Sequence, residues 1–209
     1  MMSEVASADA VAAAIAAHGF AVWRGMCNPL LCQFMQAFAI DRKVEARFNG
    51  ALTLAETHPD LQDLACRGSR AHEVFSAVLG RYELLQTKWE CILIYAHDSL
   101  RGTTWHQEAE TIPENTLICW VNLTAGCGVT SPTLGLVARA FDAPHPILLE
   151  DDDEQAAQKE AYIREMGLPT LAPSFAIGDA VFFNRHTVHR TVPVGDKARV
   201  AFKLTGISV

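Results

Sequence analysis

The sequence changes its pattern near residue 89, and this change constrains the fold more than any other feature. Before it, helix-capping residues precede apolar residues at helical spacing in three segments, at residues 7–17, 28–41 and 69–79. After it, short β-rich segments alternate with turn-forming residues, at residues 89–97, 105–109, 116–124, 134–138, 180–183, 188–192 and 198–207. Helices followed by many short strands indicate a mainly β protein, with a helical layer packed on a β-sandwich or barrel.

We expect one domain over residues 1–209, because neither an internal repeat nor a linker divides the chain. Within it, residues 1–88 are expected to form mainly helical support, with one short strand at residues 20–23. Residues 89–209 are expected to form the β core, interrupted by a polar helical insert at about residues 153–166.

The composition excludes several classes of partner. Half of the 209 residues are hydrophobic (50%), and the formal net charge is −7. An acidic chain lacks the clustered basic face that nucleic acid or an anionic membrane would require. No apolar run approaches the ~18 residues of a membrane span, and the N-terminus has no secretory signal pattern. Because the six cysteines form no CxxC pair, we expect reduced thiols and a cytoplasmic location.

Two residues in the segment 104–108 have the chemistry and the spacing to bind a metal. In a strand, residues two apart point to the same face, so His106 and Glu108 aim at one point while Gln107 faces away. A third ligand is available downstream, at His186 or His189. We favour His189, because it begins an expected strand whereas His186 lies in the preceding turn.

Two histidines and one carboxylate are the ligand set of non-haem iron oxygenases, and they leave positions open for a bidentate co-substrate and dioxygen. A chelating 2-oxo acid also has a distal carboxylate that needs a positive partner. Arg199, on the next expected strand, suits this role because its planar guanidinium matches a carboxylate. Other interpretations stay open at this point. An HxE pattern is common, the histidines are also typical of surface or capping positions, and the same ligands suit catalytic zinc.

The sequence around these residues resembles the phytanoyl-CoA dioxygenase family of iron(II)- and 2-oxoglutarate-dependent oxygenases. Residues 105–108, Trp-His-Gln-Glu, are similar to its WHQD signature, and residues 117–123 are similar to the strand that follows it. Residues 126–137 are similar to the family's NG.....VVPGSH stretch, without its last three residues. Residues 178–191 contain Gly-Asp, two phenylalanines and then His-Arg-Thr, like the family's GD-x-x-x-F and H-R-[ST] elements. The resemblance covers about residues 89–206.

This resemblance implies a double-stranded β-helix core (jelly roll, cupin-like) preceded by N-terminal α-helices. It implies three iron ligands, with His186 outside the set: His106, Glu108 and His189. It also implies three contacts to 2-oxoglutarate, the first of them at the distal carboxylate: Arg199, Thr191 and Trp120.

The chain departs from the family pattern in two ways. Glu108 stands where the family usually has Asp, and its extra methylene moves the carboxylate oxygens by about 1.5 Å. Some related oxygenases also use HxE, and halogenating relatives lack the carboxylate altogether, so Glu108 favours hydroxylation-type chemistry. Glu110, one period further along the same face, is an alternative ligand. The chain is also short for the family, with a compact region at residues 139–172 that implies a reduced lid.

The expected function is a dioxygenase that uses Fe(II), 2-oxoglutarate and O2 to hydroxylate, or otherwise oxidise, a small-molecule metabolite or natural-product intermediate, releasing succinate and CO2. The alternative is a non-oxidative metal-dependent jelly-roll protein, such as a zinc isomerase or hydrolase or a ligand-binding relative. A carboxylate clamp at Arg199 and Thr191 favours the oxygenase, because a zinc hydrolase does not need one. The sequence leaves open the substrate, the choice between hydroxylation, desaturation and cyclisation, and the oligomeric state.

Overall fold

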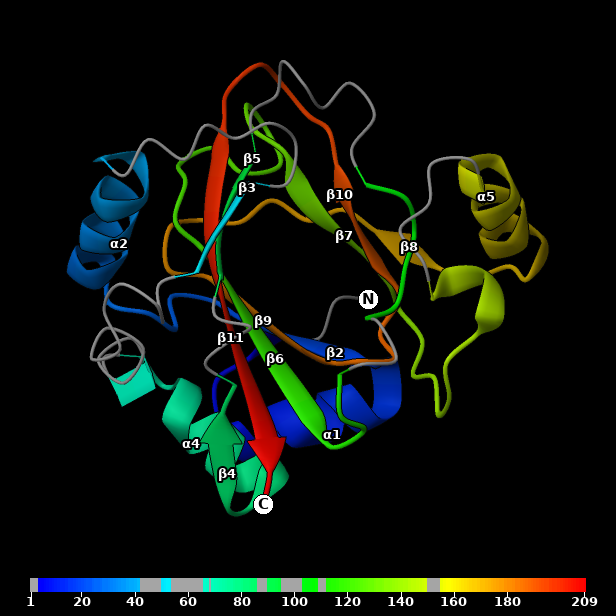
Figure 1. Cartoon of the computed structure of the whole chain (residues 1–209), viewed down its shortest axis with the longest axis horizontal. Helices are drawn as coiled ribbons and strands as arrows, with labels where there is room; N and C mark the ends of the chain where they lie inside the picture. Colours follow the sequence, from blue (N-terminus) through cyan, green and yellow to red (C-terminus); the bar gives the residue numbers. More distant parts are fainter. Residues whose placement is uncertain are drawn as a thin grey trace.

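The chain forms two facing β-sheets with helices on their outer sides (Figure 1). The computed structural model describes residues 4–41, 50–53, 66–67, 69–85, 90–94, 103–108, 112–149 and 155–209. Residues 39–41, 50–53 and 90–94 are described by their backbone alone.

The larger sheet is 8-stranded, and its main path has the order β1-β2-β9-β6-β11-β5-β3. These strands are β1 (Glu4–Val5), β2 (Phe20–Trp23), β9 (Ala180–Asn184), β6 (Thr116–Asn122), β11 (Arg199–Ser208), β5 (Glu90–Ile94) and β3 (Gly50–Thr53). The remaining strand, β4 (Tyr82–Leu84), pairs with the end of β11. All pairs are antiparallel except the short pair of β1 with β2.

The smaller sheet is 3-stranded and lies opposite β9, β6 and β11 (Figure 1). Its order is β10 (His189–Val192), β7 (Thr133–Val137) and β8 (Thr170–Leu171), with both pairs antiparallel. Two facing sheets built from sequence-distant antiparallel strands fit the expected β-rich jelly roll. In this arrangement both β10 and β11 begin with an expected site residue, His189 and Arg199.

The strand β6 has a nearly continuous apolar sequence because it is buried on both faces. Its residues alternate between two buried clusters, because successive side chains of a strand point to opposite faces. Leu117, Cys119 and Val121 pack in the cluster under the helices. Ile118 and Trp120 pack in the cluster between the two sheets. A strand that is buried on both faces carries no polar face, so its periodicity of two is hidden in the sequence.

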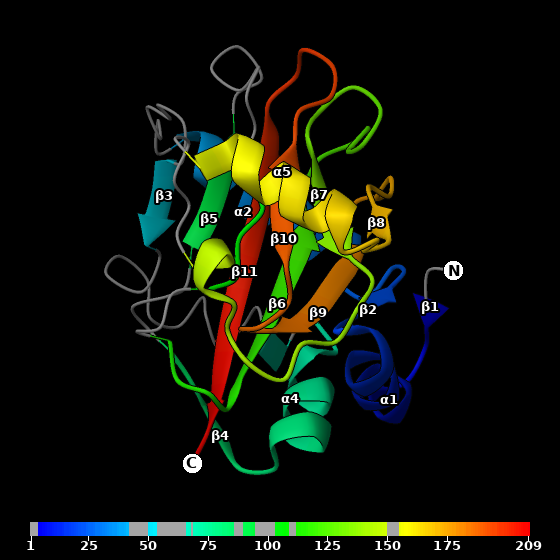
Figure 2. The same cartoon turned by 90° about the vertical axis from the view of Figure 1, so that its right-hand side faces the viewer.

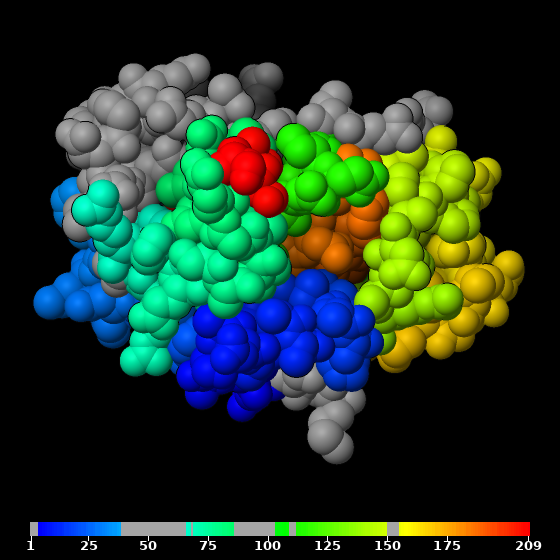
Figure 3. All heavy atoms as spheres, turned by 90° about the horizontal axis from the view of Figure 1, so that it is seen from below, coloured from blue at the N-terminus to red at the C-terminus, as the bar shows by residue number. Residues whose placement is uncertain are grey.

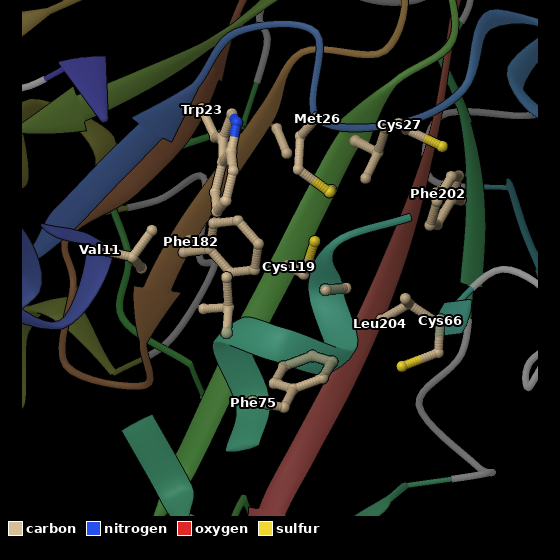
Figure 4. Close-up of a cluster of buried hydrophobic side chains, with 14 of the residues drawn as sticks. Val11, Trp23, Met26, Cys27, Cys66, Phe75, Cys119, Phe182, Phe202 and Leu204 are labelled. Carbon is tan, nitrogen blue, oxygen red and sulfur yellow. The ribbon is translucent and has the colours of Figure 1, made fainter. Parts of the chain in front are cut away.

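Helices cover the outer face of the larger sheet. These are α1 (Ala8–His18), α2 (Pro29–Asp41) and α4 (Ala71–Leu79), and α1 and α4 lie in contact at one end of the molecule (Figure 3). Val11 of α1 and Phe75 of α4 pack in the same cluster as Phe182 of β9 and Phe202 of β11 (Figure 4). Burial of such side chains contributes about 1.5–3 kcal/mol each and joins the helices to the sheet.

Local signals at both ends explain the boundaries of α1. The hydroxyl of Ser7 accepts a hydrogen bond from the backbone N–H of Ala10 at 3.3 Å, which caps the helix. At the other end, Gly19 adopts φ 84° and its N–H donates to the carbonyl of Ile15. A Cβ atom on Gly19 would lie 2.6 Å from the carbonyl oxygen of Arg139, so this position requires glycine.

A separate layer covers the outer face of the smaller sheet. It contains the short 3-10 helix η4 (Pro146–Leu148) and α5 (Ala156–Glu165), which crosses outside β7 and β10 (Figure 2). Ile163 of α5 packs with Val137 of β7 and with Val188, which precedes β10. None of the described helices is long and apolar enough to cross a membrane.

Most expected elements occur within a few residues of their expected bounds. The prediction of a strand at residues 105–109 is wrong. In the described part of that segment only His106 makes a β-bridge. The N–H of Gln107 donates to Leu148 and the N–H of Glu108 donates to Arg185, so the segment changes partner at each residue. The turn expected at residues 98–103 lies largely outside the described residues, and Glu110 lies wholly outside them.

Candidate metal centre

His106 and His189 lie beside each other at the beginning of β10. The N–H of His106 donates to the carbonyl of His189 at 3.0 Å, and the N–H of His189 donates back at 2.9 Å. This pair of bonds forms an isolated antiparallel bridge between sequence-distant segments. The two imidazole rings are consequently 4.3 Å apart between centroids.

Hydrogen bonds leave the Nε2 atoms of both histidines available as metal ligands. The Nδ1 of His106 lies 2.8 Å from the carbonyl oxygen of Thr104, and the Nδ1 of His189 lies 2.9 Å from that of Thr187. A carbonyl oxygen only accepts, so each Nδ1 carries a proton and Nε2 is the ring nitrogen that can bind a metal. Metal-binding histidines are oriented in this way, by an N–H donated from the other ring nitrogen.

Glu108 approaches the same pair of rings. Its Oε1 lies 3.8 Å from the Nε2 of His189 and 3.4 Å from the Nζ of Lys203. Burial by itself would raise the pKa of Glu108, but the nearby Lys203, His189 and His106 together lower it to about 2. Burial, with a contribution from His106, lowers the pKa of His189 to about 4. At neutral pH the site therefore presents an ionised carboxylate and a neutral imidazole, the states that bind a metal.

The donor set fits a metal, but its spacing is not that of an assembled centre. Within the described segments, no three His, Cys, Asp or Glu side chains are gathered closely enough to hold an ion as they stand. The Oε1 of Glu108 instead contacts the ammonium of Lys203. His106, Glu108 and His189 are therefore neighbours, and their role as the iron ligands stays a prediction.

Arg199 is a buried cation with unused hydrogen-bond donors. Its residue exposure is 2%, and burial lowers its pKa to about 10. Its Nη2 donates to the hydroxyl of Thr191 at 3.2 Å, while its Nε and Nη1 have no hydrogen-bond partner among the described residues. The guanidinium carbon lies 5.3 Å from the ring centroid of Trp120. Buried polar groups are almost always paired, so the two nitrogen atoms without partners among the described residues can bind an anion.

The two groups of residues share one interior. Thr191 lies two residues after His189 on β10, so its side chain points to the same face of the sheet. Across the space between the sheets, Arg199 and Lys203 lie four residues apart on β11 and contact Thr191 and Glu108 respectively. The structure thus brings together the expected metal ligands and the expected 2-oxoglutarate contacts.

His186 does not join this group. Its Nε2 pairs with Glu114 at 2.7 Å, outside the pair of site histidines. Its backbone carbonyl accepts a hydrogen bond from the amide of Gln107 at 2.6 Å. The side-chain oxygen of Gln107 in turn accepts from the backbone N–H of His145. The side chain of Gln107 thus links the segment of residues 104–108 to the turn at His186. It points away from His106 and Glu108, as expected.

Sequence reasoning missed Lys203. The sequence pattern could have indicated Lys203, because it lies four positions after Arg199 on one strand and therefore shares its face. What the sequence could not provide was the contact with Glu108, which lies 95 residues away along the chain.

The fold is shared with a group of non-heme enzymes that depend on α-ketoglutarate (2-oxoglutarate). The carbocyclase SnoK of nogalamycin biosynthesis superposes with a TM-score of 0.74 at 16% sequence identity, over 97% of this chain and 86% of SnoK. The epimerase SnoN of the same biosynthesis, in complex with Fe3+, α-ketoglutarate and nogalamycin RO, has a TM-score of 0.72 at 18% identity, over 96% of this chain and 83% of SnoN.

A third similar structure is EctD from S. alaskensis with 2-oxoglutarate and 5-hydroxyectoine. Its TM-score is 0.67 at 16% identity, over 95% of this chain and 75% of EctD. No protein-family model matches the sequence, and a search of curated proteins by sequence finds no match either. At these identities the comparisons establish the fold, and the function has to be argued from the residues of this chain.

Proposed function

We propose that the protein is an Fe(II)- and 2-oxoglutarate-dependent dioxygenase that oxidises a small-molecule metabolite or natural-product intermediate, with release of succinate and CO2. The observation that carries the proposal is the buried guanidinium of Arg199, whose Nε and Nη1 lack partners among the described residues. It lies in the same interior as two histidines with available Nε2 atoms and an ionised carboxylate. A generic metal site does not require such a cation.

In this proposal each end of 2-oxoglutarate has its own set of residues. Arg199 holds the distal carboxylate through its free donors, and Thr191 orients the guanidinium through its hydroxyl. Trp120 packs against the guanidinium face and prevents it from turning away. His106, His189 and Glu108 hold the iron near the other end of the co-substrate. The bound iron supplies the oxidising chemistry with dioxygen, which amino-acid side chains lack.

Apolar side chains line part of this interior. Phe183 packs against the ring of His189 with centroids 4.9 Å apart, and Leu136 and Ala201 belong to the same buried cluster. An apolar wall next to the site excludes bulk water and strengthens the interaction of Arg199 with an anion. None of these residues acts as a nucleophile or a general base, so the proposed contribution of the protein is position and exclusion of solvent.

Solved structures with this fold support the proposal at the level of chemistry. Besides SnoN and EctD, EvdO2 from Micromonospora carbonacea var. aurantiaca has been solved with 2-oxoglutarate, and HygX from Streptomyces hygroscopicus with nickel and 2-oxoglutarate. Among the neighbours are an epimerase and a carbocyclase, so one fold carries different outcomes. We propose hydroxylation as the outcome for this chain, with desaturation and cyclisation as the products to look for beside it.

Anaerobic reconstitution tests the proposal directly. Purified protein is loaded with Fe(II) and 2-oxoglutarate without oxygen, and we expect a weak metal-to-ligand charge-transfer band in the visible spectrum. Admission of air should then release succinate, even without the primary substrate, at a slow uncoupled rate. Absence of the band, together with tight retention of zinc, would favour the alternative of a non-oxidative zinc protein.

A further inference from the structure

Lys203 faces the interior of the molecule. Along β11, Val200, Phe202 and Leu204 pack in the cluster under the helices, whereas Ala201 packs in the cluster between the sheets. Because side chains alternate along a strand, Lys203 lies on the same face as Ala201. This face also carries Arg199 and Thr205, and a lysine here needs a partner, since burial of an ammonium is costly unless it is paired.

The partner of Lys203 is the Glu108 oxygen that also lies near His189. The Nζ of Lys203 lies 3.4 Å from Oε1 of Glu108, and the side chains of both residues are 13% exposed. The same Oε1 is the atom that lies 3.8 Å from the Nε2 of His189. Divalent metals bind imidazole nitrogen and carboxylate oxygen at about 2.0–2.2 Å. An ion that joins these two atoms therefore uses the oxygen that now contacts the ammonium.

We propose that Lys203 competes with the metal for Glu108. When the metal binds, the ammonium of Lys203 leaves Glu108 and forms an ion pair with the carboxylate of 2-oxoglutarate that enters with the metal. This role rests on the proposed function of the site. The contact of Glu108 with Lys203 holds the carboxylate charge before a metal arrives.

The charges in the interior give the reason for the transfer. Among the described residues that line it, Arg199 and Lys203 are cations and Glu108 is an anion that lies near both Lys203 and His189. Once a metal occupies Glu108, the ammonium of Lys203 remains buried and loses its partner, which is unfavourable. The carboxylate next to the 2-oxo group gives Lys203 a new partner, while Arg199 donates hydrogen bonds to the distal carboxylate. Metal and 2-oxoglutarate should therefore each increase the affinity of the site for the other.

Three forms of the protein test the competition: the wild type, Lys203→Met and Lys203→Arg. Met keeps the length and apolar character of the stem without the charge, and Arg keeps the charge. The affinity for Co(II) is measured by calorimetry and by its visible absorption, in the absence of 2-oxoglutarate. We expect Lys203→Met to bind Co(II) at least about tenfold more tightly than the wild type, because a cation next to the metal has been removed. Lys203→Arg should bind Co(II) like the wild type.

Repeating the titration with saturating 2-oxoglutarate tests the transfer. The co-substrate should tighten Co(II) binding in the wild type, and this tightening should shrink at least about fivefold in Lys203→Met because the displaced ammonium is absent. An equal or weaker affinity of Lys203→Met for Co(II) alone overturns the competition, since Lys203 would then merely position Glu108. Unchanged coupling overturns the transfer.

Failure of this inference can be distinguished from failure of the proposed function. If the wild type and Lys203→Met bind Co(II) and 2-oxoglutarate equally well, only the role of Lys203 is wrong. If the folded wild type binds neither Co(II) nor 2-oxoglutarate, both proposals are wrong. Circular dichroism and thermal melting of the three forms show whether each variant is folded before its affinity is compared.

Discussion

Replacing Arg199 by Met should separate ligand binding from folding. The substitution keeps an unbranched apolar stem beside Trp120 and removes the guanidinium. In the proposed complex, the guanidinium of Arg199, whose Nε and Nη1 have no partner among the described residues, forms two hydrogen bonds to the distal carboxylate of 2-oxoglutarate. Hydrogen bonds between charged groups contribute about 1.5–3 kcal/mol each, so the loss of two costs about 3–6 kcal/mol. The Kd for 2-oxoglutarate should therefore rise by about two to four powers of ten.

The same substitution should not destabilise the ligand-free protein. Arg199 is buried, and in the described structure only its Nη2 is bonded, to the hydroxyl of Thr191. A buried charge without an anionic partner is unfavourable, and an apolar residue of similar length often replaces it without loss of stability. We expect the free energy of unfolding of Arg199→Met, measured in urea, to equal or exceed that of the wild type. Lost affinity with retained stability is characteristic of a binding residue.

The assay is an anaerobic titration of 2-oxoglutarate into the Fe(II) protein, followed by the charge-transfer band and by calorimetry. Arg139 provides a matched control, because its exposed guanidinium lies over Phe141 at the surface. Arg139→Met should leave the Kd unchanged, and Arg199→Lys should give an intermediate value because one ammonium replaces a planar fork. A Kd for Arg199→Met within about threefold of the wild type would refute the assignment of the carboxylate to Arg199.

Two further predictions concern the metal ligands and the core. His189→Ala should abolish iron binding while His186→Ala, which removes the pairing with Glu114, should leave it nearly intact; the reverse pattern in a metal titration would contradict the choice of ligand. Phe202→Ala should lower the free energy of unfolding in urea by about 3–5 kcal/mol, because Phe202 is 0% exposed in the cluster under the helices. Phe34→Ala, at an exposed position of α2, is its control and should change stability by less than about 0.5 kcal/mol.

The elements of the fold followed closely from local signals. The helix α1 lies close to the expected residues 7–17, because the cap at Ser7 and the left-handed Gly19 act within a few residues of the helix ends. The strands β6, β9, β10 and β11 also lie where β-branched and aromatic residues predicted them. The prediction of a strand at residues 105–109 was wrong because the backbone of this segment is held by distant residues. Its backbone partners are His189, Leu148 and Arg185, and no local pattern encodes bonds to three distant segments.

The sequence by itself determined which residue types were available for the site and their placement on the chain. Together with the family resemblance, it predicted that His106, Glu108, His189 and Arg199 belong to one iron and 2-oxo-acid site, and that assignment stays a prediction. Only the tertiary structure decided how they meet. The bridge of His106 with His189, the Arg199 donors that lack partners in the described part of the chain, and the contact of Glu108 with Lys203 each depend on segments that meet across the fold. Such contacts form when distant segments share a buried interior. An unpaired charge is costly there, and this cost depends on residues that are far apart in the sequence, so local patterns do not predict it.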